Sequence, residues 1–404
     1  MFTAKLESGQ IINLWKTKRG NLKKMRQNVS FYCPECNGKV ILKMGEKKIM
    51  HFAHERERGC QANAEAESSY HLEGKLQLYY YLKRMGLNPE LEPYFSFIKQ
   101  RGDIGVVINN QYYVIEYQCS PINTDLLRKR TSGYLSRQIV PIWILGFKNM
   151  KKVTRGMLRL STFSSQFIVN YHEQYILPSY CSIQQKFYFY HSFFPLTVNQ
   201  TYCICTTKSL KELTDFPSIQ KYNPMLPLDQ WKHGIRKQKM YHIHYQTNIN
   251  NQFLKEIYLH KLHPHFLPPY IGIPLPSTIL FETPSLFWQT FVIIDSFLGE
   301  NKGKIISFQK ILDYFYRRID NQHIKLRKLL LETDEKSWKH AVLDYLQTLV
   351  KINIVQEIKP NFFLFKGEIK TDFHYQNQHL WEDEFYKKYA KVLLARKINE
   401  GGIG

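Results

Sequence analysis

One segment constrains the fold of this chain more than any other: residues 101–118, RGDIGVVINNQYYVIEYQ. It contains two runs of β-branched and aromatic residues, which favour strands, and Asn109 and Asn110 separate them. Asn tolerates the positive φ that a two-residue hairpin loop requires, so the segment is expected to form a β-hairpin. Such a loop pairs Ile108 with Gln111 and thereby fixes the register of both strands.

Three polar side chains are expected to meet on one face of this hairpin. Counted outward from the turn, Asp103 lies opposite Glu116, and Gln118 points to the same face as Glu116. Two carboxylates so close together repel each other and are costly to bury, and a divalent cation removes that penalty. Oxygen ligands favour Mg²⁺ or Mn²⁺. The alternative is that the hairpin frays and the acids meet solvent or a nearby Arg.

A helix is predicted immediately before the hairpin. Residues 64–86, AEAESSYHLEGKLQLYYYLKRMG, have apolar side chains at helical spacing up to Gly86, which ends the pattern. Glu67, His71 and Lys75 follow one another at four-residue intervals and form one stripe of this helix. The stripe is either a solvated face or a second wall of the acidic site.

A metal site is predicted nearer the N-terminus. Cys33 and Cys36 form a CxxC pair, and His51 and His54 form an HxxH pair after 14 intervening residues. Two short pairs separated by a hairpin-length segment are the pattern of a zinc ribbon, and Cys60 is an alternative ligand in place of one histidine. The alternative is a chance CxxC with histidines in a small core. A closed, four-coordinate zinc would be structural, not catalytic.

The charge of the chain points to a polyanionic partner. The 56 Lys and Arg outnumber the 34 Asp and Glu, giving a formal net charge of +22, which favours nucleic acid first and an anionic membrane surface second. No signal pattern is visible, and the most apolar tracts are shorter than a membrane-spanning helix requires. Seven cysteines, an odd number, indicate reduced thiols. We therefore expect a cytoplasmic protein without a membrane span.

A basic segment after the hairpin is a candidate DNA-binding element. In RKRTSGYLSRQ, residues 128–138, Arg130, Tyr134 and Arg137 share one face at helical spacing. That face would suit backbone phosphates and base stacking, and the alternative is a solvated helix. The candidate DNA-binding residues are Arg128, Lys129, Arg130, Tyr134 and Arg137.

These motifs together carry a resemblance to a known family. The order of an Asp, a hairpin and Glu-x-Gln is similar to the active-site pattern of the PD-(D/E)XK nuclease superfamily in its E-x-Q variant. The whole arrangement resembles the CoiA family of bacterial competence proteins. The matching positions are Cys33, Cys36, His51 and His54 of the ribbon, Glu67, His71 and Lys75 of the helix, Asp103, Glu116 and Gln118 of the hairpin, and the apolar strand VPIWIL at 140–145.

The resemblance implies a fold and a chemistry. The fold would be α/β (α+β), with a PD-(D/E)XK restriction-endonuclease-like core on a mixed sheet. The chemistry would be metal-dependent hydrolysis of DNA phosphodiesters, in which Asp103 and Glu116 hold Mg²⁺ or Mn²⁺ and Glu67 completes the metal shell. His71 and Lys75 would contact the phosphate.

One position departs from the superfamily. The usual lysine, two residues after the glutamate, is here Gln118. An amide cannot carry the positive charge that would stabilise an attacking hydroxide, but it can position the water or a phosphate oxygen. Lys75 would have to supply the charge from the helix.

The resemblance also implies a process and leaves two alternatives for the activity. The process is natural transformation, in which incoming single-stranded or branched DNA is processed and recombined with RecA in the cytoplasm. The first alternative to a nuclease is a catalytically weak or inactive DNA-binding recombination mediator. The second is a zinc-bearing scaffold that recruits RecA or other competence proteins.

Four regions are expected along the chain. Residues 1–62 form the zinc-ribbon-like domain and 63–164 the nuclease-like domain. Residues 165–275 are rich in aromatic residues and end in a proline-rich linker or strap. Residues 276–404 show three helices followed by two strands, which is the order of a winged helix, or else a small packing module, and they close with an amphipathic helix.

Overall fold

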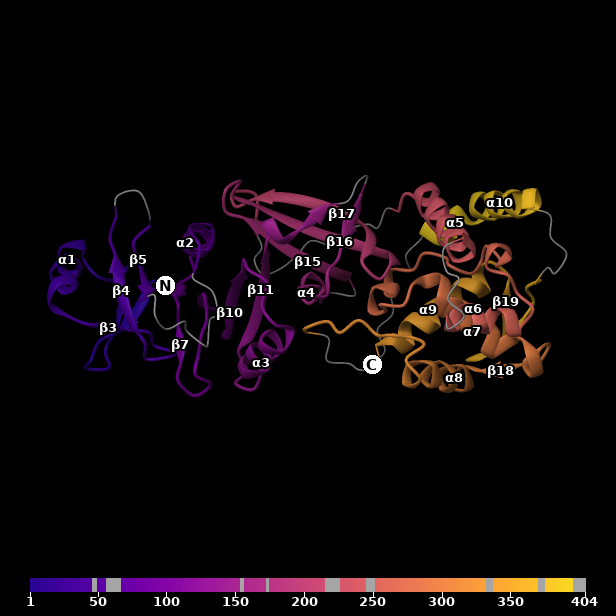
Figure 1. Cartoon of the computed structure of the whole chain (residues 1–404), viewed down its shortest axis with the longest axis horizontal. Coiled ribbons are helices and arrows are strands. Elements are labelled where there is room, and N and C mark those ends of the chain that lie inside the picture. Colours follow the sequence, from indigo (N-terminus) through magenta and orange to yellow (C-terminus); the bar gives the residue numbers. More distant parts are fainter. Residues whose placement is uncertain are drawn as a thin grey trace.

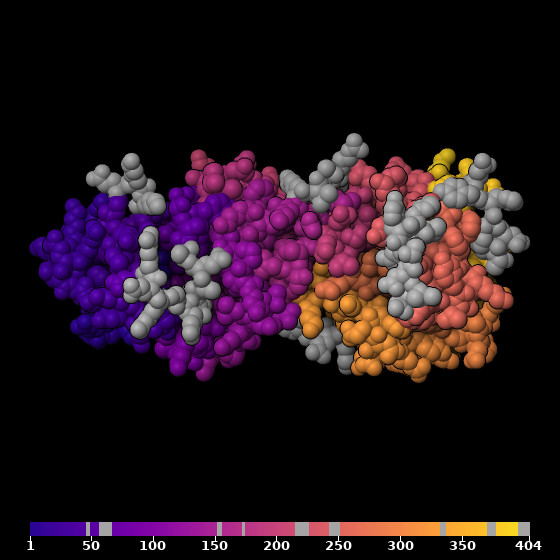
Figure 2. All heavy atoms as spheres, viewed as in Figure 1, coloured from indigo at the N-terminus to yellow at the C-terminus, as the bar shows by residue number. Residues whose placement is uncertain are grey.

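The protein is elongated, and its parts follow one another along the chain from one end to the other. In this computed structural model the N-terminal region, the central sheet and the C-terminal helices succeed each other along the long axis (Figures 1 and 2). The expected mixed α/β architecture is confirmed. The structure describes residues 1–45, 49–55, 67–152, 156–171, 174–214, 226–244, 251–331, 337–369 and 375–394.

The N-terminal region is a five-stranded antiparallel sheet with the order β2-β1-β3-β4-β5. Its last two strands form the expected ribbon hairpin, in which Val40 pairs with His54. A helix, α1, lies between the second and third strands. The bounds are β1 Thr3–Lys5, β2 Ile11–Asn13, α1 Arg19–Asn28, β3 Phe31–Tyr32, β4 Lys39–Lys43 and β5 His51–His54.

The centre of the molecule is a ten-stranded mixed sheet with the order β12-β13-β17-β16-β15-β11-β10-β9-β6, and β14 pairs with β15. The pairs β10–β11 and β11–β15 are parallel, and the other pairs are antiparallel. A separate pair is formed by β7 Tyr94–Phe95 and β8 Gln100–Arg101. The strands of the large sheet are β6 Glu90–Leu91, β9 Ile104–Ile108, β10 Gln111–Gln118, β11 Val140–Gly146, β12 Lys151–Lys152, β13 Met157–Arg159, β14 Val169–Tyr171, β15 Gln174–Cys181, β16 Lys186–Thr197 and β17 Gln200–Ser209.

The β9–β10 hairpin has the turn and the register that the sequence predicts. Asn109 and Asn110 have positive φ angles of 49° and 64°, as a type I′ turn requires. Gln111 pairs with Ile108, and the ladder continues outward in the same register. Its last pair is Ile104 with Ile115, so Asp103 lies one residue beyond the end of the ladder.

Two helices cover opposite faces of this hairpin (Figure 1). Helix α2, Ser69–Arg84, packs with Ile115 and Tyr117 of β10, whereas Val114 packs with Tyr134 of helix α3, Thr124–Leu135. Odd and even positions of a strand point to opposite faces. Residues of β10 therefore meet α2 at odd numbers and α3 at even numbers.

Helix α2 approaches the sheet closely because Gly74 faces it. A Cβ atom at Gly74 would lie 2.2 Å from the ring of Tyr117. The helix starts after Ser68, whose hydroxyl accepts a hydrogen bond from the His71 N–H. The predicted helix is thus confirmed, but it begins at Ser69, and Glu67 precedes its first turn.

The central sheet continues beyond residue 164, the predicted end of the nuclease-like domain. Strands β15, β16 and β17 extend the same sheet to Ser209. The aromatic-rich region therefore consists of strands of this sheet followed by the helices α5 Leu228–His244 and α6 Gln252–Leu259. The short helix α4 Thr162–Ser165 precedes these strands.

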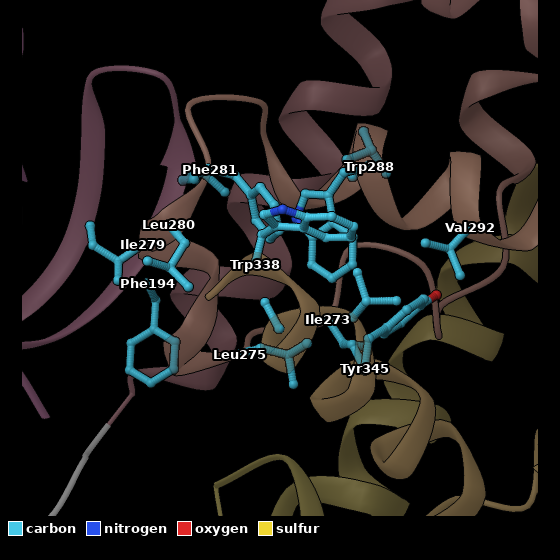
Figure 3. Close-up of a cluster of buried hydrophobic side chains, with 14 of the residues drawn as sticks. Phe194, Ile273, Leu275, Ile279, Leu280, Phe281, Trp288, Val292, Trp338 and Tyr345 are labelled. Carbon is cyan, nitrogen blue, oxygen red and sulfur yellow. The ribbon is translucent and has the colours of Figure 1, made fainter. Parts of the chain in front are cut away.

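The proline-rich segment is part of the core and not a linker. Its two 3₁₀ turns, η2 at Pro264–Phe266 and η3 at Pro276–Leu280, enclose buried Ile271 and Ile273. Ile273, Leu275, Ile279 and Leu280 lie beside Trp288, Trp338 and Tyr345 of the following helices and beside Phe194 of β16 (Figure 3). The strap therefore joins the central sheet to the C-terminal helices.

The C-terminal region has the topology of a winged helix. The chain order is α7, β18, α8, α9, β19 and β20, and the three strands form a sheet in the order β18-β20-β19. Helix α10 follows and joins α5 through ion pairs of Glu382 with Arg236 and Lys239, at 2.6 and 2.7 Å. The bounds are α7 Ser285–Phe297, β18 Ile306–Ser307, α8 Phe308–Asp320, α9 Trp338–Lys351, β19 Val355–Lys359, β20 Phe362–Phe365 and α10 Tyr375–Leu394.

Helix α9 occupies the place of the recognition helix of a winged helix, but it serves as a core element. The side chains of Trp338, Tyr345 and Leu346 on this helix are buried in the core. Its exposed side chains are His340, Asp344 and Lys351. With one acid and one lysine among them, they do not form the basic face that is typical of a DNA-binding helix, which favours the packing-module alternative.

The close approach at Gly74 gives a first prediction. Gly74→Ala should lower the midpoint of thermal unfolding, because the added methyl group overlaps the Tyr117 ring. Such overpacking costs about 1–3 kcal/mol. Gly20→Ala in α1 is the matched control, since nothing lies within 4 Å of its Cβ position, and it should raise stability by under about 1 kcal/mol. Equal effects of the two changes on unfolding followed by circular dichroism would contradict the packing described.

Candidate functional site

Three residues of the ribbon form a group that can hold a metal ion. The sulfur atoms of Cys33 and Cys36 and a ring nitrogen of His54 all lie within 4.8 Å of one another, and Cys36 Sγ is 3.4 Å from His54 Nε2. The turn between the cysteines and β4 is tight because Asn37 adopts a left-handed conformation, with φ 57°. Two thiolates and an imidazole are typical zinc ligands.

His51 does not join this group, and the predicted pairing of His51 with His54 needs correction. Both residues lie in strand β5 and are three positions apart, so their side chains point to opposite faces of the sheet. The Nδ1 atom of His51 is instead 2.7 Å from the carbonyl oxygen of Ile49. Cys60, the alternative ligand, lies outside the described residues.

A buried lysine is the centre of the second site. Lys75 is fully buried, and its ammonium nitrogen lies 2.8 Å from Glu92, 2.9 Å from Asp103 and 3.2 Å from Glu67. Burial alone would lower the pKa of Lys75, but these three carboxylates raise it above its usual value. The ammonium group therefore stays charged and holds three acids from three separate segments.

The same carboxylates have further cationic partners. Arg101 lies 3.4 Å from Glu67 and 3.5 Å from Glu92, and the amino group of Met1 lies 3.2 Å from Glu67. Burial would raise the pKa of Glu67, but Lys75 and the amino group of Met1 hold it well below the usual range. Cationic groups of the protein itself therefore neutralise the carboxylates of Glu67 and Glu92.

Asp103 is held at the end of the β9–β10 ladder. It accepts hydrogen bonds from the backbone N–H of Tyr117 at 2.9 Å, and His71 Nε2 lies 3.1 Å from the same carboxylate oxygen. Its other oxygen faces Lys75. Burial would raise the pKa of Asp103, but Lys75 and His71 lower it strongly.

Glu116 contacts a different helix from Asp103. Its carboxylate accepts short hydrogen bonds from Arg130 and from the hydroxyl of Tyr134, both on α3. Burial raises the pKa of Glu116 and Arg130 opposes this, while the negative charge of Asp103 raises it further. The two acids are neighbours, but Asp103 is bound by α2 and Glu116 by α3.

Arg130 and Tyr134 do not have the exposed, DNA-binding position that was predicted for them. Arg130 is 8% exposed and Tyr134 is fully buried, so neither side chain offers a surface to phosphates or bases. Both hold Glu116 instead. Lys129 and Arg137 remain exposed, and Arg128 is half-buried with Gln166 as a hydrogen-bond acceptor at 3.4 Å.

Gln118 shows no hydrogen bond to Asp103 or Glu116 among the contacts of the described residues. Its side-chain N–H donates to the carbonyl oxygen of Ser120 at 2.7 Å, which ties it to the chain that leaves β10. The structure therefore brings four of the predicted residues into one ionic network. They are Glu67, His71, Lys75 and Asp103.

Three charged side chains of the network were not expected from the sequence. Glu92 has a positive φ of 51° and is buried, and it accepts hydrogen bonds from both the N–H and the hydroxyl of Thr3. Arg101 and Glu35 complete the set. No sequence motif marks Glu92, which precedes a proline, or Arg101, which lies two residues before Asp103. Only the fold brings these segments together.

Glu35 connects the ribbon to this network. It lies between the two cysteines of the CxxC pair, and its carboxylate accepts the Arg101 N–H at 3.0 Å. The guanidinium of Arg101 is 3.9 Å from the same side chain, which is 2% exposed. The knuckle that contains Cys33 and Cys36 is therefore in direct contact with the acidic site.

The carboxylates of the network surround the ammonium group of Lys75 and do not enclose a separate position for Mg²⁺ or Mn²⁺. Within the part of the chain that the structure describes, Cys33, Cys36 and His54 form the only group of three or more potential ligands whose atoms lie together. The oxygens of Asp103 are directed at His71, Lys75 and a backbone N–H. A hard divalent cation needs such oxygens to face one point.

Comparison with known proteins assigns the chain to a family. Models of three CoiA domains match it: the N-terminal domain at 14–63, the nuclease-like domain at 67–223 and the C-terminal domain at 226–381. Competence protein CoiA of Bacillus subtilis (strain 168) is 30% identical over 338 residues, which cover 83% of this chain and 89% of that protein. The chain belongs to the CoiA family of competence proteins.

Membership of the CoiA family supports a role in competence. The match to the nuclease-like domain covers Glu67, Lys75 and Asp103 of the acidic network. It begins at residue 67, the first of the network acids in that domain, and runs beyond the last strand of the large sheet. No solved structure matches the chain. In the described part of the chain, no helix is long and apolar enough to cross a bilayer.

The ribbon geometry gives a prediction for zinc. His54→Ala should lose bound zinc, because His54 faces the two thiolates, whereas His51→Ala should keep it, because His51 points to the other face of β5. Elemental analysis of protein purified without chelators measures both. Loss of zinc in His51→Ala with retention in His54→Ala would contradict this assignment, and a wild-type protein without zinc would exclude the site.

The network gives a prediction for stability. Lys75→Met should lower the free energy of unfolding by about 3–5 kcal/mol, because it leaves buried carboxylates without their counter-ion. Lys83→Met, on an exposed position of the same helix, is the control and should change it by under about 0.5 kcal/mol. Urea unfolding of both variants tests this, and similar midpoints would show that Lys75 does not hold the network together.

Proposed function

We propose that this CoiA-family protein binds single-stranded or branched DNA in the cytoplasm during natural transformation and promotes its recombination. In this proposal the nuclease-like domain serves as a binding and assembly module, not as a hydrolase. The observation that carries the proposal is the full burial of Lys75 among three carboxylates. The resemblance to CoiA implies RecA and other competence proteins as partners in that process.

The ion pairs argue against phosphate binding at the acidic network. A phosphate at Lys75 would have to displace carboxylates that already neutralise the ammonium group, and it would have to enter the interior of the protein. At Glu116 the places that a ligand would take are filled by Arg130 and Tyr134. Removing any one partner would leave a buried charge unpaired, which is costly.

The overall charge supports binding to DNA at the surface. The net charge is +22, and each ion pair of the network cancels one positive charge with one negative charge. The excess of positive charge therefore lies outside the network, where it can attract phosphates. Binding of this kind releases counterions and becomes weaker as salt increases.

The second candidate function is Mg²⁺- or Mn²⁺-dependent hydrolysis of DNA. It is favoured by the match to a nuclease-like domain, which suggests metal dependence, and by the meeting of Asp103, Lys75 and Glu67 in one network. Catalysis in this arrangement would require the ion pairs to open. It would also require Gln118 to leave Ser120.

One set of measurements separates the two candidates. We expect single-stranded DNA to bind with a log–log salt slope of several units, at about 0.7 per phosphate contact. We also expect no cleavage of single-stranded or branched DNA in Mn²⁺. Fluorescence anisotropy and gel electrophoresis on the same highly purified protein measure the two properties.

Asp103→Asn is the control for this experiment, since it keeps the shape of the side chain and removes its charge. Cleavage by the wild type that Asp103→Asn abolishes would establish the second candidate and refute the first. Cleavage that persists in the variant would indicate a contaminating nuclease. A flat salt response would contradict DNA binding through phosphates.

A further inference from the structure

We propose that helix α1 and the turn before it form a docking surface for the phosphate backbone of DNA. This inference rests on the proposed binding of DNA and assigns it to a particular surface of the N-terminal region. The surface is named here the α1 surface. Its basic residues are Lys16, Lys18, Arg19, Lys23, Lys24 and Arg26.

The α1 surface is the product of a long acid-free segment. No Asp or Glu occurs between Glu7 and Glu35, whereas this interval contains the six basic residues within positions 16–26. All six side chains are exposed, and Leu22 is the buried residue of α1. The helix therefore presents most of its circumference to solvent, and that circumference is cationic.

The cations of α1 are not engaged by acids of the protein. Among the described residues, Arg19, Lys23, Lys24 and Arg26 form no ion pair, and Lys16 makes one exposed contact of 3.8 Å with Glu90. Arg130, Arg236 and Arg318 are instead held by carboxylates at 2.5 to 2.7 Å. An unpaired cation keeps its full attraction for an external polyanion.

The spacing along the helix suits a row of phosphates. Arg19, Lys23 and Arg26 lie at intervals of four and three residues and form one stripe. The stripe is roughly 10 Å long at 1.5 Å per residue, so its three cations can meet phosphates along one stretch of a DNA strand.

A nucleic acid fits this surface better than a membrane does. A helix that lies on a bilayer needs large apolar residues on one face in addition to its basic residues. The large hydrophobic side chains that are more than a third exposed include none between Arg19 and Asn28; the nearest are Ile11 and Val29. The exposed positions that are not basic include Asn21, Gln27 and Asn28, which are polar.

The α1 surface lies at the outer end of the molecule and leads towards the acidic network. Helix α1 is at the end of the long axis opposite the C-terminal helices (Figure 1). The turn before it meets the central sheet, because the Asn13 amide donates to Leu91 O at 3.3 Å and Lys16 faces Glu90. Both partners are in β6, and Glu92 of the network follows directly. DNA held by α1 would therefore extend along the nuclease-like domain.

The test removes three charges from the stripe and three from a matched surface. The first variant is Arg19→Gln, Lys23→Gln and Arg26→Gln, since Gln retains good helix propensity. The control variant is Lys302→Gln, Lys304→Gln and Lys310→Gln, which removes the same net charge from exposed positions of the C-terminal region. Binding of a fluorescent single-stranded oligonucleotide is measured over a series of salt concentrations.

The two variants should differ in the salt slope. Loss of three phosphate contacts lowers the slope by about 2 units and the affinity by about 100-fold near 0.1 M salt. The control should keep the wild-type slope, and the zinc content and thermal midpoint of both variants should match those of the wild type. A change confined to the first variant supports the proposal.

The outcomes separate this inference from the proposed function. If the wild type binds no DNA, the proposed function fails. If the wild type binds DNA and the first variant keeps its slope, or if both variants lose equally, the assignment to α1 fails while DNA binding stands. Binding of the wild type to phosphatidylglycerol vesicles that the first variant loses, with DNA binding unchanged, would overturn the proposal in favour of a membrane surface.

Discussion

The ammonium group of Lys75 is the interaction on which the centre of this protein depends. It is fully buried and joins Glu67, Glu92 and Asp103, which lie before α2, directly after β6 and directly before β9. A charge in the interior is tolerated only when it is paired and hydrogen-bonded. The three segments must therefore stay together for the nuclease-like domain to keep its fold, and Gly74 lets the helix come close enough to hold them.

The same network joins the N-terminal region to the nuclease-like domain through hydrogen bonds. Glu35, between the two cysteines, binds Arg101, and Thr3 of β1 binds Glu92. A metal ion at Cys33, Cys36 and His54 would fix the knuckle that carries Glu35. The ribbon would thus support the acidic site by holding Glu35 in place beside Arg101. The cations therefore fall into two groups: buried ones that pair with acids of the network, and exposed ones, such as those of α1, for which we propose a role in DNA binding.

Much of the architecture was predictable because it follows from local patterns. The Asn109–Asn110 turn, the register of its hairpin, helix α2 and the order of the C-terminal helices and strands depend on turn chemistry and periodicity, and all are confirmed. The meeting of His71 and Lys75 with Asp103 was also predictable from helical spacing. Family membership adds what the pattern alone cannot supply, a role in competence.

The sequence by itself determined which side chains carry charge, where the strands turn and which residues form ligand pairs. Only the tertiary structure decided what those side chains meet. Strand alternation places His51 on the face of β5 opposite to the metal group. Arg130 and Tyr134 are buried and donate hydrogen bonds to Glu116, so they do not form a DNA-binding surface. Glu92 comes from another segment of the chain and pairs with Lys75. The physical reason is that a buried charge takes the partner nearest in space, and distance in space between remote segments is set by the packing of the whole chain.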